Sequence, residues 1–399
     1  MKKVRLVEVV NDFNKIRVPL SSNQRKLLKK IYPYYGAQGI VDYVEDFLFD
    51  GEYLLIAEDG ENLKSNNQNI CNMVKGKFWV NNHAHILQGK KDNLTRYLYY
   101  KLNTINFSPF VTGSSQPKLN KENLFSIEFF IHENIKTQRK IAKILSDIDD
   151  KIEILHQIND NLAELAKTIY DYWFVQFDFP DENGKPYKSS GGKMLYNEVL
   201  KREIPEGWEV ESLGEIEPNI ITGKTPPTKD ENNFNGNILF ITIDDIRQNL
   251  FIYNSERTLS EKGANTQRAK FLKKGDICVS CIGTVGVIGI VGKIAQTNQQ
   301  INSISNPQNF NKYFLLNYLG RYFKDNFTAK KGAVLDNMNK AEFESIIIIN
   351  PIQNIKEIYY GKVKFLYKKI DTNIQQIQHL QSLRDWLLPM LMNGQISVK

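Results

Sequence analysis

Two long segments with a helical repeat of apolar residues constrain this chain more than any other feature. The first runs from about residue 135 to 174 and contains no Gly or Pro, and the second runs from about residue 353 to 388, before Pro389. Apolar residues recur at steps of three and four, the spacing of one helix face. A helix of roughly 40 residues would be about 60 Å long, which is typical of a coiled coil or a spacer. We expect helix–helix packing through Ile148, Ile152, Leu155, Ile158, Leu162, Ile370, Ile374, Ile377 and Leu380.

The two segments also match each other, and so do the regions that precede them. Ile148-Asp149 corresponds to Ile370-Asp371, and Leu119-Asn120-Lys121 corresponds to Met338-Asn339-Lys340. Asn81-Asn82-His83 is similar to Thr297-Asn298-Gln299. Repetition at a fixed offset indicates that one structural unit occurs twice. We therefore predict two halves, each made of a globular domain followed by a long helix.

The globular parts have the pattern of mixed, strand-rich domains, because short apolar runs alternate with Gly, Asn and Asp turns. The stretch between the halves is polar and rich in turn residues. We place the boundaries at the changes of pattern. They give a first globular domain, a first helix, a linker, a second globular domain and a second helix, at residues 1–134, 135–178, 179–205, 206–352 and 353–399.

Composition excludes several classes of protein. Of the 399 residues, 41% are hydrophobic and 24% are charged, which is a globular balance. No apolar run approaches the ~18 residues that a membrane span needs. Three cysteines cannot form a disulfide framework, so we expect a cytoplasmic protein. The net charge of +7 permits binding to nucleic acid without requiring it.

Several motifs follow one another in a fixed order along the chain. They include Gln138-Arg139-Lys140-Ile141-Ala142 with Asp149–Ile152, Tyr172–Phe179, residues 184–192 with Ile204–Trp208, and Leu383–Pro389 with Gly394. Over essentially the whole chain they resemble, in turn, the central region, the linker and the C-terminal region of the specificity (S) subunits of type I restriction-modification systems. The first half resembles one target-recognition subfamily at Tyr32–Ala37 and Ala57–Gly60, and the second half resembles another at Gly223–Pro226 and Thr297–Gln300.

The resemblance implies an α+β (mixed) fold with two target-recognition domains separated by two long antiparallel helices in a pseudo-twofold repeat. It implies that each domain binds one half of a bipartite double-stranded DNA site. Two methyltransferase (M) subunits would dock on the helices, and restriction (R) motor-nuclease subunits would join them. The chain itself would be non-catalytic and need no cofactor. A 60 Å spacer compares with about 34–36 Å per DNA turn, so half-sites one to two turns apart are within reach. Because the halves differ in sequence, we predict an asymmetric target.

DNA recognition needs Asn, Gln, Arg or Lys at base edges, and further polar side chains at phosphates. Suitable loops occur in both halves. In the first half the candidates are Tyr34, Tyr35, Asn81, Asn82, His83, Ser114, Ser115, Gln116 and Lys118. In the second half they are Thr222, Lys224, Thr225, Thr284, Asn298, Gln299, Gln300, Lys330, Lys331 and Asn337. For each of them an ordinary solvated loop is the competing interpretation, and Asn82 and Asn298 could instead hold local strand geometry.

Motifs for other chemistry are incomplete. Gly223-Lys224-Thr225 lacks the earlier Gly of a nucleotide-binding loop, since position 218 is Pro. Cys278 and Cys281 form a lone pair where a structural zinc needs four ligands, and His83 and His85 have no third ligand nearby. We therefore expect no metal and no catalytic residue. Two alternatives stay open: a protein-binding coiled-coil scaffold, and a free-standing DNA enzyme with an unrecognised active site.

Overall fold

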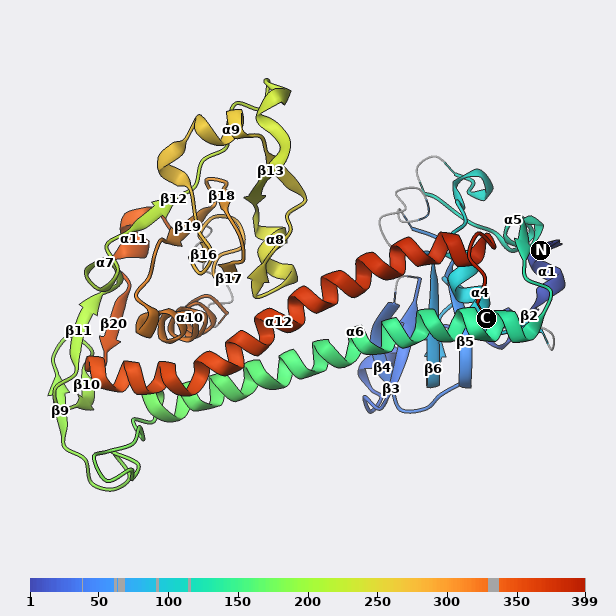
Figure 1. Ribbon diagram of the computed structural model, residues 1–399. Helices are drawn as coiled ribbons and strands as arrows, with labels where there is room; N and C mark the ends of the chain where they lie inside the picture. The colour runs from blue at the N-terminus through green and yellow to red at the C-terminus, as the bar shows by residue number, and fades with distance from the viewer. Residues whose placement is uncertain are drawn as a thin grey trace. The chain divides into compact units, whose positions relative to one another are not determined.

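The structure is a computed structural model that describes residues 1–37, 39–60, 63, 69–90, 93–113, 116–328 and 337–398. It divides into two compact units, Met1–Glu153 with His379–Lys399, and Ile154–Gln378. The long helices α6 (Ile135–Tyr170) and α12 (Gln353–Met392) each contribute one part to unit 1 and one part to unit 2 (Figure 1). The 36 residues of α6 correspond to about 54 Å of helix.

Unit 1 is built on a sheet with the strand order β2-β7-β5-β6-β3-β4, in which β3 runs parallel to β6. Alternate residues of β5 face two different cores, as a strand period of two requires. Leu54 and Ile56 pack with helix α4, whereas Leu55 packs with Phe78 on the other face. The strands are β1 (Lys2–Arg5), β2 (Val10–Asp12), β3 (Tyr32–Gly36), β4 (Gly39–Val44), β5 (Phe49–Ala57), β6 (Cys71–Val80), β7 (Ala84–Gly89) and β8 (Glu128–Ile131). The short helices are α1 (Leu6–Val9), α2 (Ser22–Lys26), α4 (Thr95–Leu102) and α5 (Lys121–Ser126).

Unit 2 holds one sheet of order β12-β19-β16-β17-β14 and another of order β15-β13-β18. Its largest core joins these strands to α10 and to the ends of the long helices, with an aromatic centre at Phe174, Phe314 and Tyr359. The strands are β9 (Met194–Asn197), β10 (Arg202–Pro205), β11 (Glu209–Ser212), β12 (Ile220–Thr222), β13 (Phe234–Ile241), β14 (Phe251–Ile252), β15 (Arg257–Leu259), β16 (Ile277–Ser280), β17 (Ile288–Val291), β18 (Ala295–Thr297), β19 (Ile301–Ile304) and β20 (Ile347–Asn350). The helices are α7 (Leu213–Ile216), α8 (Ile243–Gln248), α9 (Glu261–Asn265), α10 (Asn309–Phe323) and α11 (Lys340–Glu344).

The same frame of elements precedes each long helix. In unit 1, β1 leads into α1, and α5 leads into β8, which pairs antiparallel with β1. In unit 2, β11 leads into α7, and α11 leads into β20, which pairs antiparallel with β11. Asn120 and Asn339 cap α5 and α11 by accepting the backbone N–H three residues later, at 2.8 and 3.0 Å. The predicted mixed fold in two repeats is confirmed, and these caps explain why the Leu-Asn-Lys and Met-Asn-Lys motifs match.

An aspartate at equivalent positions of the two long helices binds a tyrosine of the adjoining globular part. In unit 1, the Tyr100 hydroxyl donates to Asp149 at 2.6 Å, and Arg384 of α12 pairs with the same carboxylate at 2.9 Å. In unit 2, the Tyr253 hydroxyl donates to Asp371, and Lys274 pairs with that carboxylate at 3.2 Å. The matched Ile-Asp pairs of the sequence therefore mark the same joint in each unit.

The helices run in opposite directions within unit 2. Asn159 of α6 accepts a hydrogen bond from Asn373 of α12 at 2.8 Å, and Tyr170 packs beside Tyr359. The predicted packing residues Ile152, Leu155, Ile370, Ile374 and Ile377 are buried, while Ile148, Ile158, Leu162 and Leu380 are partly buried. Pro389 lies in the last turn of the second helix, which ends at Met392, and its carbonyl accepts the N–H of Asn393 at 3.0 Å.

Candidate nucleic-acid interface

The first-half surface is the turn between β6 and β7 together with the chain that contacts it. Asn81 accepts the backbone N–H of His83 at 2.8 Å, and the His83 ring lies 2.6 Å from the Asp59 carboxylate. Arg17 holds the far side of the turn by donating to the carbonyls of Asn82 and Ala84 and to Glu58. The turn is thereby fixed, and the exposed side chains of Asn82 and His83 extend from a rigid base.

The other first-half candidates differ in how far their side chains are exposed to solvent. The backbone of Lys118 forms a bridge with Asp59, which places this residue beside the turn. The side chains of Lys118 and of Gln116, two residues earlier, are exposed. Tyr34 has an exposed fraction of only 1%, and its hydroxyl accepts the Leu20 N–H at 2.9 Å. The Tyr34 side chain is therefore out of reach of DNA here and supports the loop before α2, whereas Tyr35 is partly exposed. Ser114 and Ser115 lie outside the described residues.

The second-half surface joins two segments that are far apart in sequence. Thr222 donates to Asn302 at 2.7 Å, Thr225 donates to Gln299 at 2.7 Å, and the Lys224 N–H donates to the Thr297 carbonyl at 2.9 Å. Gly223 makes this possible, because a Cβ at that position would lie 2.1 Å from the Asn298 carbonyl oxygen. Asn298 and Gln300 bond to each other at 2.9 Å, which leaves Lys224 and Gln299 exposed at the rim.

The loop Ile282–Val287 completes the second-half surface. Position 283 lies beside the Gln300 amide, and Ile282 forms a bridge with Asn337. Thr284 is exposed and accepts a hydrogen bond from Arg247 of α8 at 2.5 Å. Thr222, Lys224, Thr225, Thr284, Asn298, Gln299, Gln300 and Asn337 are thus gathered on neighbouring loops of unit 2. Lys330 and Lys331 lie outside the described residues.

Three of the residues considered for metal binding are buried, and the His85 ring is hydrogen-bonded at both nitrogens. Cys278 and Cys281 are buried, and burial raises the pKa of both thiols, to about 12 and about 11. His85 is buried between Asn14 and the Leu119 carbonyl. Within the described ranges, no group of three or more His, Cys, Asp or Glu side chains is placed to hold a metal ion.

The repeated frame corresponds to one family model matched twice along the chain. The model describes the type I restriction modification DNA specificity domain, and it matches residues 1–164 and 205–382. The chain belongs to this specificity family.

Curated members of the family are similar over most of their length. The HindI specificity subunit of Haemophilus influenzae is 31% identical over 335 residues, which cover 70% of this chain and 71% of that protein. The MjaIX specificity subunit of Methanocaldococcus jannaschii is 28% identical over 314 residues, covering 77% and 70%. A solved type I S subunit from M. genitalium has the same fold, with a TM-score of 0.60, 16% identity and coverage of 98% and 96%.

Sequence reasoning about this specificity-family chain missed three positive groups. Arg17 and Arg247 reach the two surfaces from elements distant in sequence, so no local spacing marks them. The segment Arg25–Lys30 carries two adjacent pairs of basic residues and an unusually exposed Leu27, at 88%. That segment was recognisable as a basic run with an apolar residue at its centre, which is a feature of an interaction surface.

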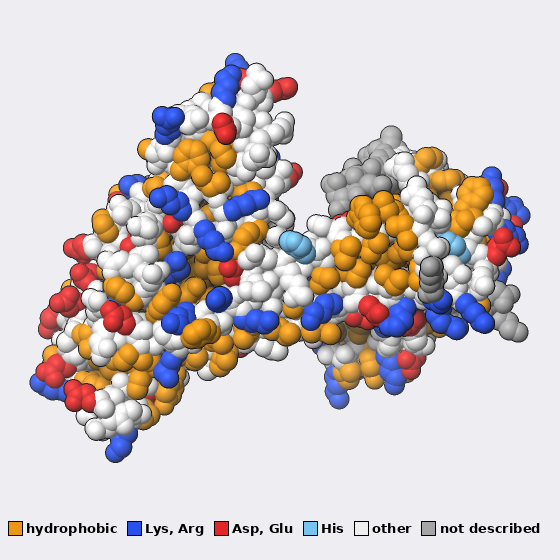
Figure 2. Space-filling view, in the orientation of Figure 1, with side chains coloured by type: hydrophobic (Ala, Val, Ile, Leu, Met, Phe, Trp, Pro, Cys, Tyr) orange, Lys and Arg blue, Asp and Glu red, His pale blue; other side chains and the backbone are white. Residues whose placement is uncertain are grey.

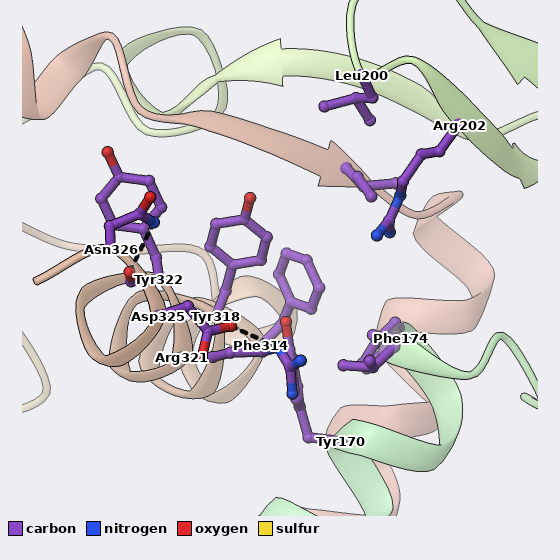
Figure 3. A pocket seen from close by; sticks show the side chains of 12 residues that line it. Tyr170, Phe174, Leu200, Arg202, Phe314, Tyr318, Arg321, Tyr322, Asp325 and Asn326 are labelled. Carbon is purple, nitrogen blue, oxygen red and sulfur yellow. Dashed lines mark hydrogen bonds and ion pairs between the residues drawn. The ribbon is translucent and has the colours of Figure 1, made fainter. Parts of the chain in front are cut away.

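A cavity of about 380 Å³ lies where β10, α10 and the end of α6 meet in unit 2 (Figure 3). Its aromatic lining includes Phe174, Phe314 and Tyr318, and Tyr318 donates to the Ile347 carbonyl at 2.5 Å. Arg321 is neutralised by Asp171 and by Asp325, each at 3.3 Å. The cavity therefore belongs to the joint between the helix and the domain, and Arg202, which lies over the Phe177 ring, also lines it. None of the described helices is long and apolar enough to cross a membrane.

Proposed function

We propose that this chain is the DNA-specificity subunit of a type I restriction-modification complex, and that the first-half and second-half surfaces each bind one half of an asymmetric double-stranded site. The observation that carries the proposal is the double occurrence of the family domain, with a rigid turn and exposed amide, hydroxyl and lysine side chains in each copy. The two surfaces use different residues, and this favours two different half-site sequences.

The chemistry of each surface suits groove recognition. Amide side chains such as Asn82 and Gln299 offer a donor and an acceptor side by side, the pattern that pairs with adenine in the major groove. Lys118 and Lys224 offer point charges for phosphates, which fix position and contribute no sequence information. Both kinds of group are exposed at the rim of their surface. In this proposal the turns stay rigid, so little conformational entropy is lost on binding.

The proposal assigns the long helices two roles. As a spacer, α6 with its 36 residues sets how far apart the half-sites lie. As a docking surface, the helices present large apolar side chains to solvent, including Ile154 and Leu165 of α6 and Trp386 of α12, with exposed fractions of 49%, 48% and 55%. These favour association with two methyltransferase subunits, to which restriction subunits add. Methyl transfer and cleavage belong to those partners, and this chain contributes no catalytic group.

The test is to express the chain with the methyltransferase subunit encoded beside it and to map methylated bases across a genome. The expected result is one split motif with a fixed gap and two different halves. A palindromic or continuous motif would contradict the asymmetric two-surface proposal. An absence of methylation from a stable complex with a demonstrably competent methyltransferase would favour the scaffold alternative. Cleavage or methylation of DNA by the purified chain alone would favour the enzyme alternative.

A further inference from the structure

A second cavity of unit 2 is lined by four lysines and one carboxylate. It has a volume of about 380 Å³ and lies between the ends of β14 and β17, α10, and the first half of α12. We call it the lysine pocket and define it by Lys274, Lys312, Lys364, Lys368 and Asp371. Lys and Arg side chains also gather over α12 and the neighbouring part of unit 2 on the face shown in Figure 2.

Most of the positive charge of the lysine pocket is uncompensated. Asp371 is already engaged by Lys274 at 3.2 Å, by the Tyr253 hydroxyl and by Gln375. No carboxylate in the described part of the chain forms an ion pair with Lys312, Lys364 or Lys368. Four lysines and one aspartate leave a net charge of +3 in one small cavity. Like charges that line one cavity repel each other, and a bound anion would relieve that repulsion.

Two of the lysines, Lys312 and Lys364, have specific neighbours. The Lys312 ammonium occupies the space where Gly275 has no side chain, since a Cβ there would lie 2.7 Å from Nζ. The Lys364 ammonium lies 5.0 Å from the centroid of the Phe365 ring and 5.9 Å from the centroid of the Tyr360 ring. Aromatic rings attract a cation but do not neutralise its charge. Burial also lowers the pKa of Lys312, although the charge of the nearby Asp276 carboxylate acts in the opposite direction.

Helix packing alone does not require these lysines. At the equivalent positions of the first half, 222 residues earlier, Lys364 and Lys368 are replaced by Ala142 and Ser146. The cavity there, of about 310 Å³, is lined by Lys75 and Arg96 together with Asp149, Asp150 and Glu153, a net charge of −1. The same frame thus carries a basic cavity in one half and a mildly acidic one in the other.

We propose that the lysine pocket binds a backbone phosphate of the DNA duplex that the second-half surface engages. The inference rests on the proposed function. Its geometry follows from β17, which begins directly after the loop Ile282–Val287 and whose last two residues, Ile290 and Val291, line the pocket. Four residues of strand span about 13 Å. The major groove is about 12 Å wide and is bordered by phosphates, so a loop in the groove brings a flanking backbone close to the pocket. The ammonium groups clamp a phosphate oxygen without reading any base.

The decisive experiment measures the salt dependence of duplex binding by the assembled complex. The test variants are Lys312→Gln and the double variant Lys364→Gln/Lys368→Gln. The matched control is Lys185→Gln/Lys188→Gln, which removes the same charge from exposed positions of the linker. Each complex is titrated with a duplex that carries the mapped motif and with an unrelated duplex, at several salt concentrations. We expect the slope of log K against log salt to become shallower by about 0.9 for one lost phosphate contact.

The remaining readouts separate the possible explanations. In the test variants, affinity should fall by the same factor for both duplexes, and the methylated motif should stay unchanged. If the wild-type complex binds in a motif-dependent way but the variants keep the wild-type salt slope, the phosphate contact in the lysine pocket is refuted. The proposed function is unaffected by that result. Loss of methyltransferase from the complex would overturn it in favour of a protein contact. A wild-type complex with no motif preference would overturn the proposed function itself.

A footprint of the unmodified complex covers the case in which a variant fails to fold. Lysine ammonium groups are acetylated with and without the motif duplex, and the modified positions are identified by mass spectrometry. Protection of Lys364 and Lys368 by DNA, with Lys185 and Lys188 equally reactive in both states, supports the proposal. Equal reactivity of Lys364 and Lys368 with and without DNA contradicts it.

Discussion

His85 illustrates how a single buried side chain ties three segments of unit 1 together. Asn14 accepts the Ile86 N–H through its carbonyl oxygen at 2.8 Å, so its amino group faces His85 Nδ1 at 3.1 Å. His85 Nδ1 is therefore an acceptor, and Nε2–H donates to the Leu119 carbonyl at 2.8 Å. Protonation would place an N–H against the Asn14 amino group. The ring is thus held in its neutral form.

The first prediction follows from the pKa of His85, which burial lowers below the usual 6.5. As pH falls below about 6.5, the unfolded chain binds a proton that the folded chain does not, so stability decreases. We expect the melting temperature to fall between pH 7.5 and 5.5, and to fall less in His85→Gln, which keeps one acceptor and one donor but does not titrate. His156→Gln, on the exposed face of α6, is the control. An equal acid response in all three proteins would refute the role of His85.

The second prediction concerns the exposed amides of the two surfaces. Gln299→Ala should relax base preference only in one half of the methylated motif, and Asn82→Ala only in the other half. Each change should weaken binding by about 1–3 kcal/mol, the usual discrimination of an amide–base contact. The two variants serve as controls for each other. If both relaxed the same half of the motif, or neither relaxed any base, the assignment of the surfaces would be wrong.

At the residue scale, the sequence locates a turn where the turn residues follow each other along the chain, and the role of their side chains in DNA binding stays a prediction. The Asn81–His83 and Asn298–Gln300 turns lie where short apolar strands end, and turn-forming residue types predict such strand ends. The residue type of Tyr34 suggests a DNA contact, but its side chain is buried and its hydroxyl accepts the Leu20 N–H. Arg17 and Arg247 reach their surfaces through contacts 67 and 37 positions apart in the sequence, and spacing carries no such information.

At the scale of elements, a buried polar pair interrupts the apolar contact between the long helices in unit 2. Asn373 is fully buried, donates to Asn159 at 2.8 Å, and has a carbonyl oxygen without a partner in the described structure. A single Asn pair between helices fixes their register at a cost in stability, because an apolar pair at the same place would pack in any nearby register. The pair therefore specifies alignment within unit 2.

The third prediction separates register from stability. Asn159→Leu/Asn373→Leu should leave the stability of unit 2 unchanged or raise it, because both polar groups are removed together. Asn373→Ala alone should lower stability by about 1–3 kcal/mol, since Asn159 loses its partner. Urea unfolding of the full chain measures both. A destabilised double variant would contradict this account. If the pair fixes the register, the double variant should methylate motifs with more than one gap length between the half-sites.

The long helices were predictable because their pattern is local and repeats over ten turns. Sheet pairing was not predictable, because β3 pairs in parallel with β6, and β13 with β18, through residues far apart in the sequence, such as Tyr34 with Trp79 and Leu239 with Ala295. Parallel neighbours depend on contacts that no short window of sequence contains. The repeat was nonetheless visible in the sequence, since the caps at Asn120 and Asn339 and the joints at Asp149 and Asp371 each need one particular side chain.

At the scale of the whole molecule, the fourth prediction tests the helices as a spacer. Removal of residues 150–156 and 377–383 takes seven residues from each helix, between the Asp149–Arg384 and Asn159–Asn373 contacts. Seven residues preserve the phase of the apolar stripe and shorten a helix by about 10 Å. We expect the gap of the methylated motif to shrink by about 3 base pairs, at ~3.4 Å per pair, while both half-sites stay the same. An unchanged gap would refute the spacer role.

The tyrosine–aspartate joint has a consequence for how such a chain can acquire new specificities. The elements β1–α1 and α5–β8 of the first half match β11–α7 and α11–β20 of the second half, and the residues that they enclose differ between the halves. In both halves a tyrosine of the enclosed part donates its hydroxyl to an aspartate of the long helix, Tyr100 to Asp149 and Tyr253 to Asp371. A foreign segment that begins and ends on the same antiparallel strand pair and presents a tyrosine at the joint would keep this contact to the helix beneath it. Genetic exchange at those strands would therefore replace half of a target sequence in one step, without any compensating change elsewhere in the gene.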